Sequence, residues 1–318
     1  MTHLDLLPSV PQVFLTLFVA LVLKWIITCF TCWFSSKKLH EVHKKDWKKD
    51  VVYLYQFKRS PIMPNISPFC LKVEAWLRAN NIKYEICDSW MQRSKEGLLP
   101  FVELNGEQIA DSQLIIARLQ KHFNVDDGLK GTERGAARAV DRMIDGSTFY
   151  ALLYSKVLEN AAKIVNRDVS GMPVPTSLTP FAAALFAQKI RKRLMAEGMA
   201  RHEREDIVAI LRRDIQAVDD LLGDKKFLFG DKPTTPDFSV FGHLATSYYL
   251  PYNQPITDLL NNDFPRIKAY IERMKTDLFP EWKNEGNHRS AGWCSATAFS
   301  IRFITASIVP ILATNIQV

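Results

Sequence analysis

Ser67-Pro68 and Cys70 place a hydroxyl and a thiol at the start of one expected helix. Serine at the N-cap and proline at the first helical position are typical of a helix start, here of the stretch SPFCLKVEAWLRANN. A thiolate in the first turn would have its pKa lowered by the helix dipole, but the exposed first position is a serine, which supplies no thiolate. The pattern leaves open whether Ser67 is a functional hydroxyl or only the N-cap. For Cys70 it favours a small, buried apolar side chain.

Asp111-Ser112 opens a second expected helix, which ends near Phe123. The N-terminus of a helix carries partial positive charge, so Ser112 and the first-turn amides can hold a carboxylate. Asp111 can accept a hydrogen bond from an ammonium group. The alternative is that either residue merely caps the helix.

Short strands must position these two helix starts. The β-branched and aromatic run from Val51 to Phe57 predicts a buried strand, and residues 84–87 predict a second. Residues 101–104 and 107–110 flank Asn105-Gly106, a hairpin signal. A strand, helix, strand order this short implies a parallel pair with a right-handed crossover. The order β-α-β-β-α predicts a thioredoxin-like module.

The second half of the chain is expected to be all-helical. Residues 131–163 are helix-periodic with Gly146 as a weak point, and helices are predicted over residues 180–199 and 203–222. Thr234 with Asp237 three residues later predicts a capping box at the start of a buried helix.

Leu99-Pro100-Phe101 looks like the loop of glutathione transferases in which a cis proline precedes the third strand. Asp111-Ser112 resembles that family's acidic-serine motif for the γ-glutamyl end of glutathione. The resemblance implies a glutathione-S-transferase fold and a cis Leu99–Pro100 bond. It also implies a site in which Leu99 and Pro100 bind the backbone of glutathione. Ser67 is then the candidate catalytic residue, donating to the thiolate, and Cys70 lies beside it.

A narrower resemblance covers most of residues 10–283. KKDVVYLYQF at residues 48–57 and PNISPFCLK at residues 64–72, behind an apolar N-terminal stretch, look like the failed axon connections and cadmium-responsive proteins. These are distant relatives of the metaxins. The resemblance implies a role in stress or cadmium handling at an endomembrane, reported as lysosomal for the cadmium-responsive branch.

Residues 13–34 predict a transmembrane helix. Twenty-two residues at helical rise reach about 33 Å, enough for the hydrocarbon core. Lys24 costs about 3 kcal/mol, which thirteen Leu, Ile, Val and Phe residues outweigh. Six lysines follow between residues 37 and 50, so the positive-inside rule predicts a single-pass membrane protein whose folded domain faces the cytosol. A cleaved signal or a buried helix is the alternative.

Composition excludes several functions. Of the net charge of +7, +3 lies in the basic segment of residues 37–50 after the apolar stretch, and no aromatic-interleaved basic stripe appears elsewhere, so no nucleic acid is expected. The five cysteines show neither a disulfide framework nor zinc spacing, so no metal site is predicted. Cys29 and Cys32 are interpreted as apolar filler or palmitoylation sites. Residues 291–313 predict an interfacial or packed tail, because their apolar residues only balance Arg302.

The sequence therefore predicts an α/β thioredoxin-like domain followed by an all-α domain. The expected segments are an N-terminal stretch 1–12, a transmembrane helix 13–34, a basic linker 35–50, the thioredoxin-like domain 51–125, the helical domain 126–283 and a tail 284–318. One expected function is a membrane-tethered transferase-like protein with glutathione as co-substrate. The other is a non-catalytic adaptor or scaffold at a membrane, as in the metaxins. A homodimer or a protein partner is expected in either case.

Overall fold

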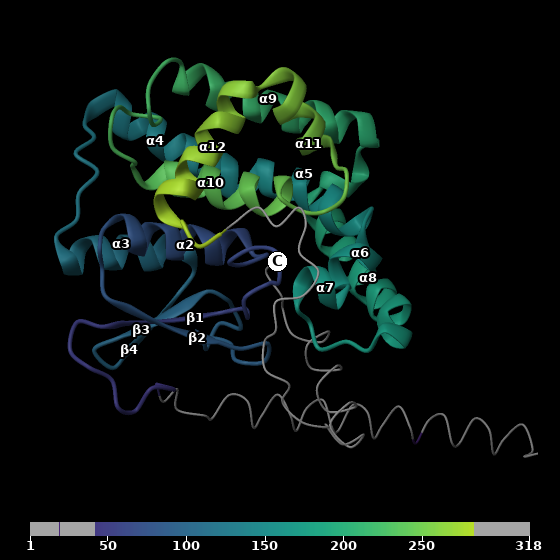
Figure 1. Ribbon diagram of the computed structural model, residues 1–318, viewed down its shortest axis with the longest axis horizontal. Coiled ribbons are helices and arrows are strands. Elements are labelled where there is room, and N and C mark those ends of the chain that lie inside the picture. The colour runs from purple at the N-terminus through teal and green to yellow at the C-terminus, as the bar shows by residue number, and fades with distance from the viewer. Residues whose placement is uncertain (1–18, 20–41, 283–318) are drawn as a thin grey trace, which may run out of the picture. The chain divides into compact units, whose positions relative to one another are not determined.

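The computed structural model describes residue 19 and residues 42–282. The chain divides into two compact units, residues 1–43 and 44–318, and all helices and strands discussed below belong to the second. A four-stranded sheet in the order β2-β1-β3-β4 forms its base (Figure 1). Its strands are β1 (Val52–Gln56), β2 (Tyr84–Asp88), β3 (Phe101–Leu104) and β4 (Glu107–Ala110). β1 and β2 are parallel, whereas β1–β3 and β3–β4 are antiparallel. The predicted strand order is confirmed.

Two helices, α2 (Pro68–Ala79) and α3 (Ser112–Phe123), cover one face of this sheet (Figure 1). Every residue of α2 from Pro68 to Leu77 is buried, because the sheet lies on one side and the helical half on the other. The β3–β4 hairpin turns at Asn105-Gly106, which both have positive φ (50° and 83°), as the twist of a tight hairpin requires. The hairpin prediction is confirmed.

The helical half follows residue 130. Its elements are α4 (Gly131–Met143), η1 (Ile144–Thr148), α5 (Phe149–Leu153), η2 (Tyr154–Leu158), α6 (Ala161–Val165), α7 (Arg167–Ser170), η3 (Thr176–Leu178), α8 (Thr179–Glu197), η4 (Met199–Arg201), α9 (Arg204–Leu222), α10 (Thr235–Tyr248), α11 (Pro255–Asp258), η5 (Leu259–Asp263) and α12 (Pro265–Leu278). The helices predicted over 180–199 and 203–222 correspond to α8 and α9.

The first long helix is interrupted twice by π-helical turns. One of these, η1, contains Gly146, the predicted weak point, and the other, η2, has no glycine. A π turn changes the direction in which the side chains after it point, and such turns are often found at functional sites. They matter here because they carry Asp145 and Lys156, two buried charged side chains considered below.

Helix α10 joins the two halves by lying directly on α2. A Cβ built on Gly242 would come within 2.6 Å of the Pro68 carbonyl oxygen, so this crossing requires glycine. The predicted capping box is present: Asp237 Oδ2 accepts from both the amide and the hydroxyl of Thr234, each at 2.7 Å. The Tyr270 hydroxyl of α12 also donates to Asp237, at 2.8 Å, which anchors the closing helix.

The end of the predicted basic linker, from Lys44 onward, lies against the β3–β4 hairpin. The Lys44 amide donates to Glu103 Oε2 at 2.9 Å, and the Asp50 amide donates to Asn105 Oδ1 at 2.8 Å. The stretch immediately before β1 is therefore held in place by hydrogen bonds.

The predicted localisation is contradicted. In the described part of the chain, residues 19 and 42–282, no helix is both long enough and apolar enough to cross a bilayer. The longest helices there, α8 and α9, have 19 residues each and carry several charged side chains. A single-pass membrane protein is therefore not supported. The predicted span, residues 13–34, lies outside the described residues apart from Val19, and the predicted interfacial or packed tail at residues 291–313 also lies outside them.

Cys70 and Cys87 are the cysteines within the described ranges, and both are free thiols. Cys29, Cys32 and Cys294 lie outside those ranges. Within residues 42–282 no group of three or more His, Cys, Asp or Glu side chains could hold a metal ion.

Candidate functional site

The sheet register brings the predicted site residues to one edge. Tyr55 pairs with Phe101, and Phe101 pairs with Ala110 on its other side. Strands β1 and β4 point the same way, so both end at this edge, where Pro100 enters β3. Helices α2 and α3 follow from that edge on the same face of the sheet, which places both their N-termini there.

The Leu99–Pro100 peptide bond is cis, as predicted. Leu99 is 1% exposed and Pro100 is also buried. The loop that delivers them, residues 89–98, comes from the end of β2.

Ser67 occupies the N-cap of α2, but its side chain does not cap the helix. The residue is fully buried, its amide donates to Asn65 Oδ1 at 3.0 Å, and its hydroxyl makes no capping hydrogen bond. The interpretation of Ser67 as a side-chain cap is therefore wrong, although Ser67 does occupy the N-cap position. Oγ has no partner of acceptable geometry among the described residues, which is unusual for a buried hydroxyl.

Cys70 lies one turn further along α2 and is completely buried. Burial raises the pKa of its thiol to about 12, and the nearby Ser67 hydroxyl offsets only part of that rise. A thiol with such a pKa is not a nucleophile at neutral pH. The prediction of a buried apolar filler at this position is confirmed.

Asp111 is the N-cap of α3. Its Oδ1 accepts from the amides of Gln113 (2.9 Å) and Leu114 (3.2 Å), so capping is one of its functions. Its backbone has φ 73° and ψ 124°, a conformation that costs non-glycine residues about 1–3 kcal/mol and is concentrated at functional sites. Asp111 is half-buried and Ser112 is 4% exposed.

Gln113, next in sequence, connects this helix start to a buried ion cluster between the two halves. Lys72 Nζ of α2 bonds to Asp141 Oδ1 at 3.1 Å and to Asp145 Oδ2 at 2.9 Å, and Gln113 Nε2 donates to Asp145 Oδ2 at 2.7 Å. Lys72 is fully buried. Burial alone would raise the pKa of Asp145, but the Lys72 ammonium holds it below its ordinary value.

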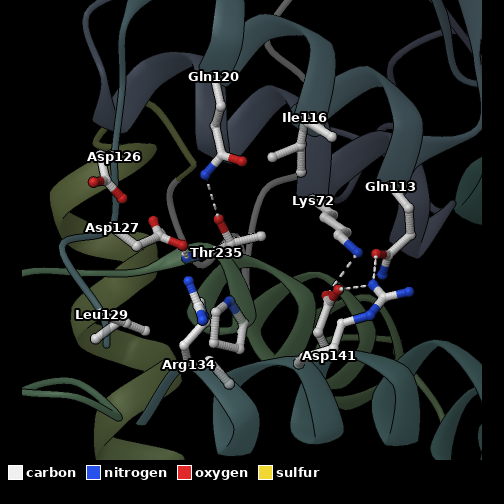
Figure 2. A pocket seen from close by; sticks show the side chains of 14 residues that line it. Lys72, Gln113, Ile116, Gln120, Asp126, Asp127, Leu129, Arg134, Asp141 and Thr235 are labelled. Carbon is white, nitrogen blue, oxygen red and sulfur yellow. Dashed lines mark hydrogen bonds and ion pairs between the residues drawn. The ribbon is translucent and has the colours of Figure 1, made fainter. Parts of the chain in front are cut away.

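A cavity of about 280 Å³ lies above this cluster, between α3, α4 and the start of α10 (Figure 2). Lys72 and Asp141 form one end of it, and Asp127 and Thr235 form the other. Its lining includes Gln113 but none of Ser67, Leu99, Pro100, Asp111 and Ser112. The cavity is therefore a neighbour of the predicted site and does not contain it.

Lys156, carried by the π turn η2, contacts the residue that precedes the N-cap of α2. Its ammonium donates to the Ile66 carbonyl at 2.6 Å, directly before Ser67. Burial lowers the pKa of Lys156 to about 7. This hydrogen bond and a second one, from the Ser60 hydroxyl to the Val169 carbonyl at 2.6 Å, fasten the loop of residues 58–66 to the helical half.

Sequence reasoning missed Lys72, Gln113 and Lys156. One signal was available: Lys72 lies within a run that is apolar on both sides, so a charged side chain there had to be buried and paired. Nothing in the sequence indicated Lys156, because its burial depends on the π turn and on a loop 90 residues away.

Two family models match the chain. The model described as "Glutathione S-transferase N-terminal domain" matches residues 68–162, and "Glutathione S-transferase, C-terminal domain" matches residues 211–274. The crystal structure of CsGST63524, a glutathione S-transferase of Ceriporiopsis subvermispora in complex with glutathione, superposes with a TM-score of 0.50 and 16% identity. That superposition covers 71% of this chain and 97% of the other. The fold and the two domain matches define a glutathione-S-transferase-fold protein.

Three proteins with similar sequences indicate which family within this fold class the chain belongs to. "Failed axon connections" of Drosophila melanogaster is 37% identical over 255 residues, which is 76% of this chain and 61% of that protein. "Isoprene-epoxide--glutathione S-transferase" of Rhodococcus sp. (strain AD45) is 28% identical over 67% of this chain and 93% of its own length. "Metaxin-2" of Homo sapiens is 21% identical over 74% of this chain and 91% of its own length. The chain belongs to a glutathione-S-transferase-like, metaxin-related family. These relatives do not support the expected membrane anchoring or cadmium response.

Proposed function

We propose that this protein binds glutathione at the sheet edge where α2 and α3 begin. The observation that carries the proposal is the convergence of two helix N-termini with the Asp111 carboxylate at that edge. Such termini favour anionic groups, and glutathione has two carboxylates and a thiolate to place. The names of the Rhodococcus relative and of the fungal complex agree with this ligand.

The hydrogen bonds already present in α3 limit which groups could donate to the γ-glutamyl carboxylate. In the first turn of α3, the amides of Gln113 and Leu114 donate to Asp111 Oδ1, and the Ile115 amide donates to the Asp111 carbonyl at 2.8 Å. The Ser112 amide and hydroxyl are therefore the expected donors. The second oxygen of Asp111 would accept from the α-ammonium, because Oδ1 is already engaged.

At the other end of the ligand, the Pro100 loop would pair the glutathione backbone, and the Ser67 hydroxyl would donate to the thiolate. An unpartnered hydroxyl is suited to that function, since it loses no internal hydrogen bond when the ligand arrives. Residues that cover Ser67 must move for the thiolate to reach it, because Ser67 is fully buried.

Calorimetric titration of the full chain with glutathione tests the proposal, with cysteinylglycine, which lacks the γ-glutamyl group, as the matched ligand. Asp111→Asn keeps the helix cap but removes the charge. We therefore expect it to weaken the binding of glutathione by about 1.5–3 kcal/mol and to leave the binding of cysteinylglycine unchanged. A folded protein that binds no glutathione at millimolar concentration would reject glutathione binding.

A non-catalytic adaptor of the same fold is the second candidate. It is favoured by the full burial of Ser67 and by the raised pKa of the Cys70 thiol, because neither of these two groups is then available for conjugation as the structure stands. Conjugation of glutathione to chlorodinitrobenzene separates the two functions: turnover that falls in Ser67→Ala supports the enzyme, and its absence in wild type supports the adaptor. Homodimerisation stays a prediction for both.

A further inference from the structure

The cavity between α3, α4 and the start of α10 has two ends, and its charged side chains are paired at only one of them (Figure 2). At the paired end, Lys72 bonds to Asp141 and to Asp145. Arg138 of α4 donates to Gln113 Oε1 and, at 3.4 Å, to Asp141 Oδ2. The charges at this end therefore have partners within the protein and do not require a ligand.

The other end of the cavity contains two groups of opposite charge, Arg134 and Asp127, that form no ion pair with each other. The Arg134 guanidinium has no hydrogen bond or ion pair within residues 42–282, although Figure 2 shows it directed from α4 into the cavity. The Asp127 carboxylate accepts from the Thr235 amide, at 3.2 Å to each oxygen. A carboxylate has about four acceptor sites, so Asp127 can accept further hydrogen bonds from a ligand.

The surroundings of Asp127 favour a cationic partner. The residue is half-buried, and burial raises the pKa of its carboxyl, to which the negative charges of Asp126 and Asp141 add. A cation placed beside Asp127 would lower that pKa and offset the repulsion between the carboxylates. Arg134 has the opposite requirement, because a guanidinium binds a carboxylate through two parallel hydrogen bonds. This end of the cavity therefore suits a ligand with one ammonium and one carboxylate group.

The size and the remaining lining of the cavity limit the ligand further. Apolar surface is contributed by Ile116, Ala117, Ala137 and Pro236. The volume of about 280 Å³ is below the range of pockets for drug-sized ligands, which is about 300–1,000 Å³. The exposed side chains of Asp126 and Arg134 also line the cavity, so solvent reaches it. These properties fit a molecule of amino-acid size better than a peptide.

We propose that this cavity binds a free α-amino acid, with its carboxylate on Arg134, its ammonium group on Asp127 and its side chain against the apolar lining. An α-amino acid has both charged groups on one carbon atom, which matches two unpaired groups of opposite charge at one end of a cavity. The name "interdomain site" denotes this cavity below, because α3, α4 and the segment that joins them all line it. The site goes beyond glutathione binding and does not require it.

Isothermal titration calorimetry of the full chain tests the interdomain site with two amino acids, norleucine for an apolar side chain and glutamine for an amide. We expect at least one of them to bind with a Kd of about 1 mM or lower. Two derivatives of the tighter ligand then remove one charged group each: the primary amide lacks the carboxylate, and the N-acetyl derivative lacks the ammonium group. Each should bind at least about tenfold more weakly than the parent amino acid. No binding of either amino acid at about 10 mM would reject the site.

Two variants assign the charged groups of the ligand to residues. Arg134→Met should weaken the amino acid at least about tenfold and leave its amide unchanged, because the amide has no carboxylate. Asp127→Asn keeps an acceptor for the Thr235 amide. It should weaken the amino acid by a similar factor and leave the N-acetyl derivative unchanged. The controls Arg142→Met and Glu133→Gln remove the same charges from exposed positions of α4 that do not line the cavity, and should bind within about twofold of wild type.

Equal losses in test and control variants would reject the interdomain site. Losses that are the same for the amino acid and both derivatives would also reject it, because they would not depend on the charged groups of the ligand. Urea unfolding verifies that each variant folds. If Asp127→Asn does not fold, Arg134→Met and the comparison of the three ligands on wild type still decide the outcome, since Arg134 is exposed.

The γ-glutamyl end of glutathione carries the same ammonium and carboxylate groups, and the same variants separate the two sources. A separate amino-acid site predicts that the glutathione affinity is unchanged in Arg134→Met and that saturating glutathione does not displace the amino acid. Parallel loss of both affinities, with competition between the ligands, would reject a separate site. If wild type binds the amino acid as expected and binds no glutathione, only the proposed glutathione function fails.

Discussion

Replacing Ser67 with alanine should stabilise the protein. A serine N-cap normally contributes about 1 kcal/mol through its side chain, so a capping serine predicts a loss on truncation. Here the hydroxyl is buried, makes no capping bond and has no partner of acceptable geometry among the described residues. An unsatisfied buried hydroxyl costs about 1–3 kcal/mol, and its removal forfeits only the contacts of one oxygen atom. We therefore expect Ser67→Ala to raise the free energy of unfolding by about 1 kcal/mol.

Urea denaturation followed by circular dichroism measures this difference, and Thr234→Val provides a matched control. Thr234 is also a buried N-cap hydroxyl, but it donates to Asp237 at 2.7 Å, so its loss should destabilise by about 1.5–3 kcal/mol. Opposite signs for the two variants would support the finding that Ser67 Oγ has no hydrogen-bond partner among the described residues. A loss of 1 kcal/mol or more in Ser67→Ala would refute it, since the hydroxyl would then have a partner.

Three other variants test the interface and the site. Lys72→Met leaves the Asp141 and Asp145 carboxylates buried without their cation, so we expect a loss of about 3–5 kcal/mol by urea denaturation; a loss under 1 kcal/mol would contradict the cluster. The pKa of Lys156 in the folded state is about 7, below that of a lysine in the unfolded chain. Above pH 7 the folded protein therefore holds Lys156 neutral, while the unfolded chain still binds the proton. Wild-type stability should therefore rise relative to Lys156→Met between pH 7 and 10, by up to about 1.4 kcal/mol per pH unit, and parallel curves would argue against that pKa. Asp111→Ala, unlike Asp111→Asn, should lower the free energy of unfolding by about 1 kcal/mol through the lost cap; equal free energies for the two variants would show that the cap contributes nothing.

Local patterns were enough to predict the sheet, the hairpin at Asn105-Gly106 and the bounds of α8 and α9 to within about two residues. The Leu99–Pro100 conformation and the family came from resemblance to known transferases. These features depend on residues close together in sequence, or on motifs short enough to compare directly. The roles of Ser67, Leu99, Pro100, Asp111 and Ser112 toward glutathione stay predictions.

The sequence by itself determined the order of strands and helices and the places where α2 and α3 begin, because alternation, periodicity and capping are local properties. Only the tertiary structure decided which groups surround Lys72, the burial of Lys156, and that the Ser67 side chain makes no capping hydrogen bond. Lys72 meets its carboxylate partners 69 and 73 residues away, and Lys156 meets Ile66 90 residues away. The environment of a charged side chain is set by the residues that pack around it. Here those neighbours are supplied by two π turns and by the interface between the two domains, so no local sequence pattern could identify them.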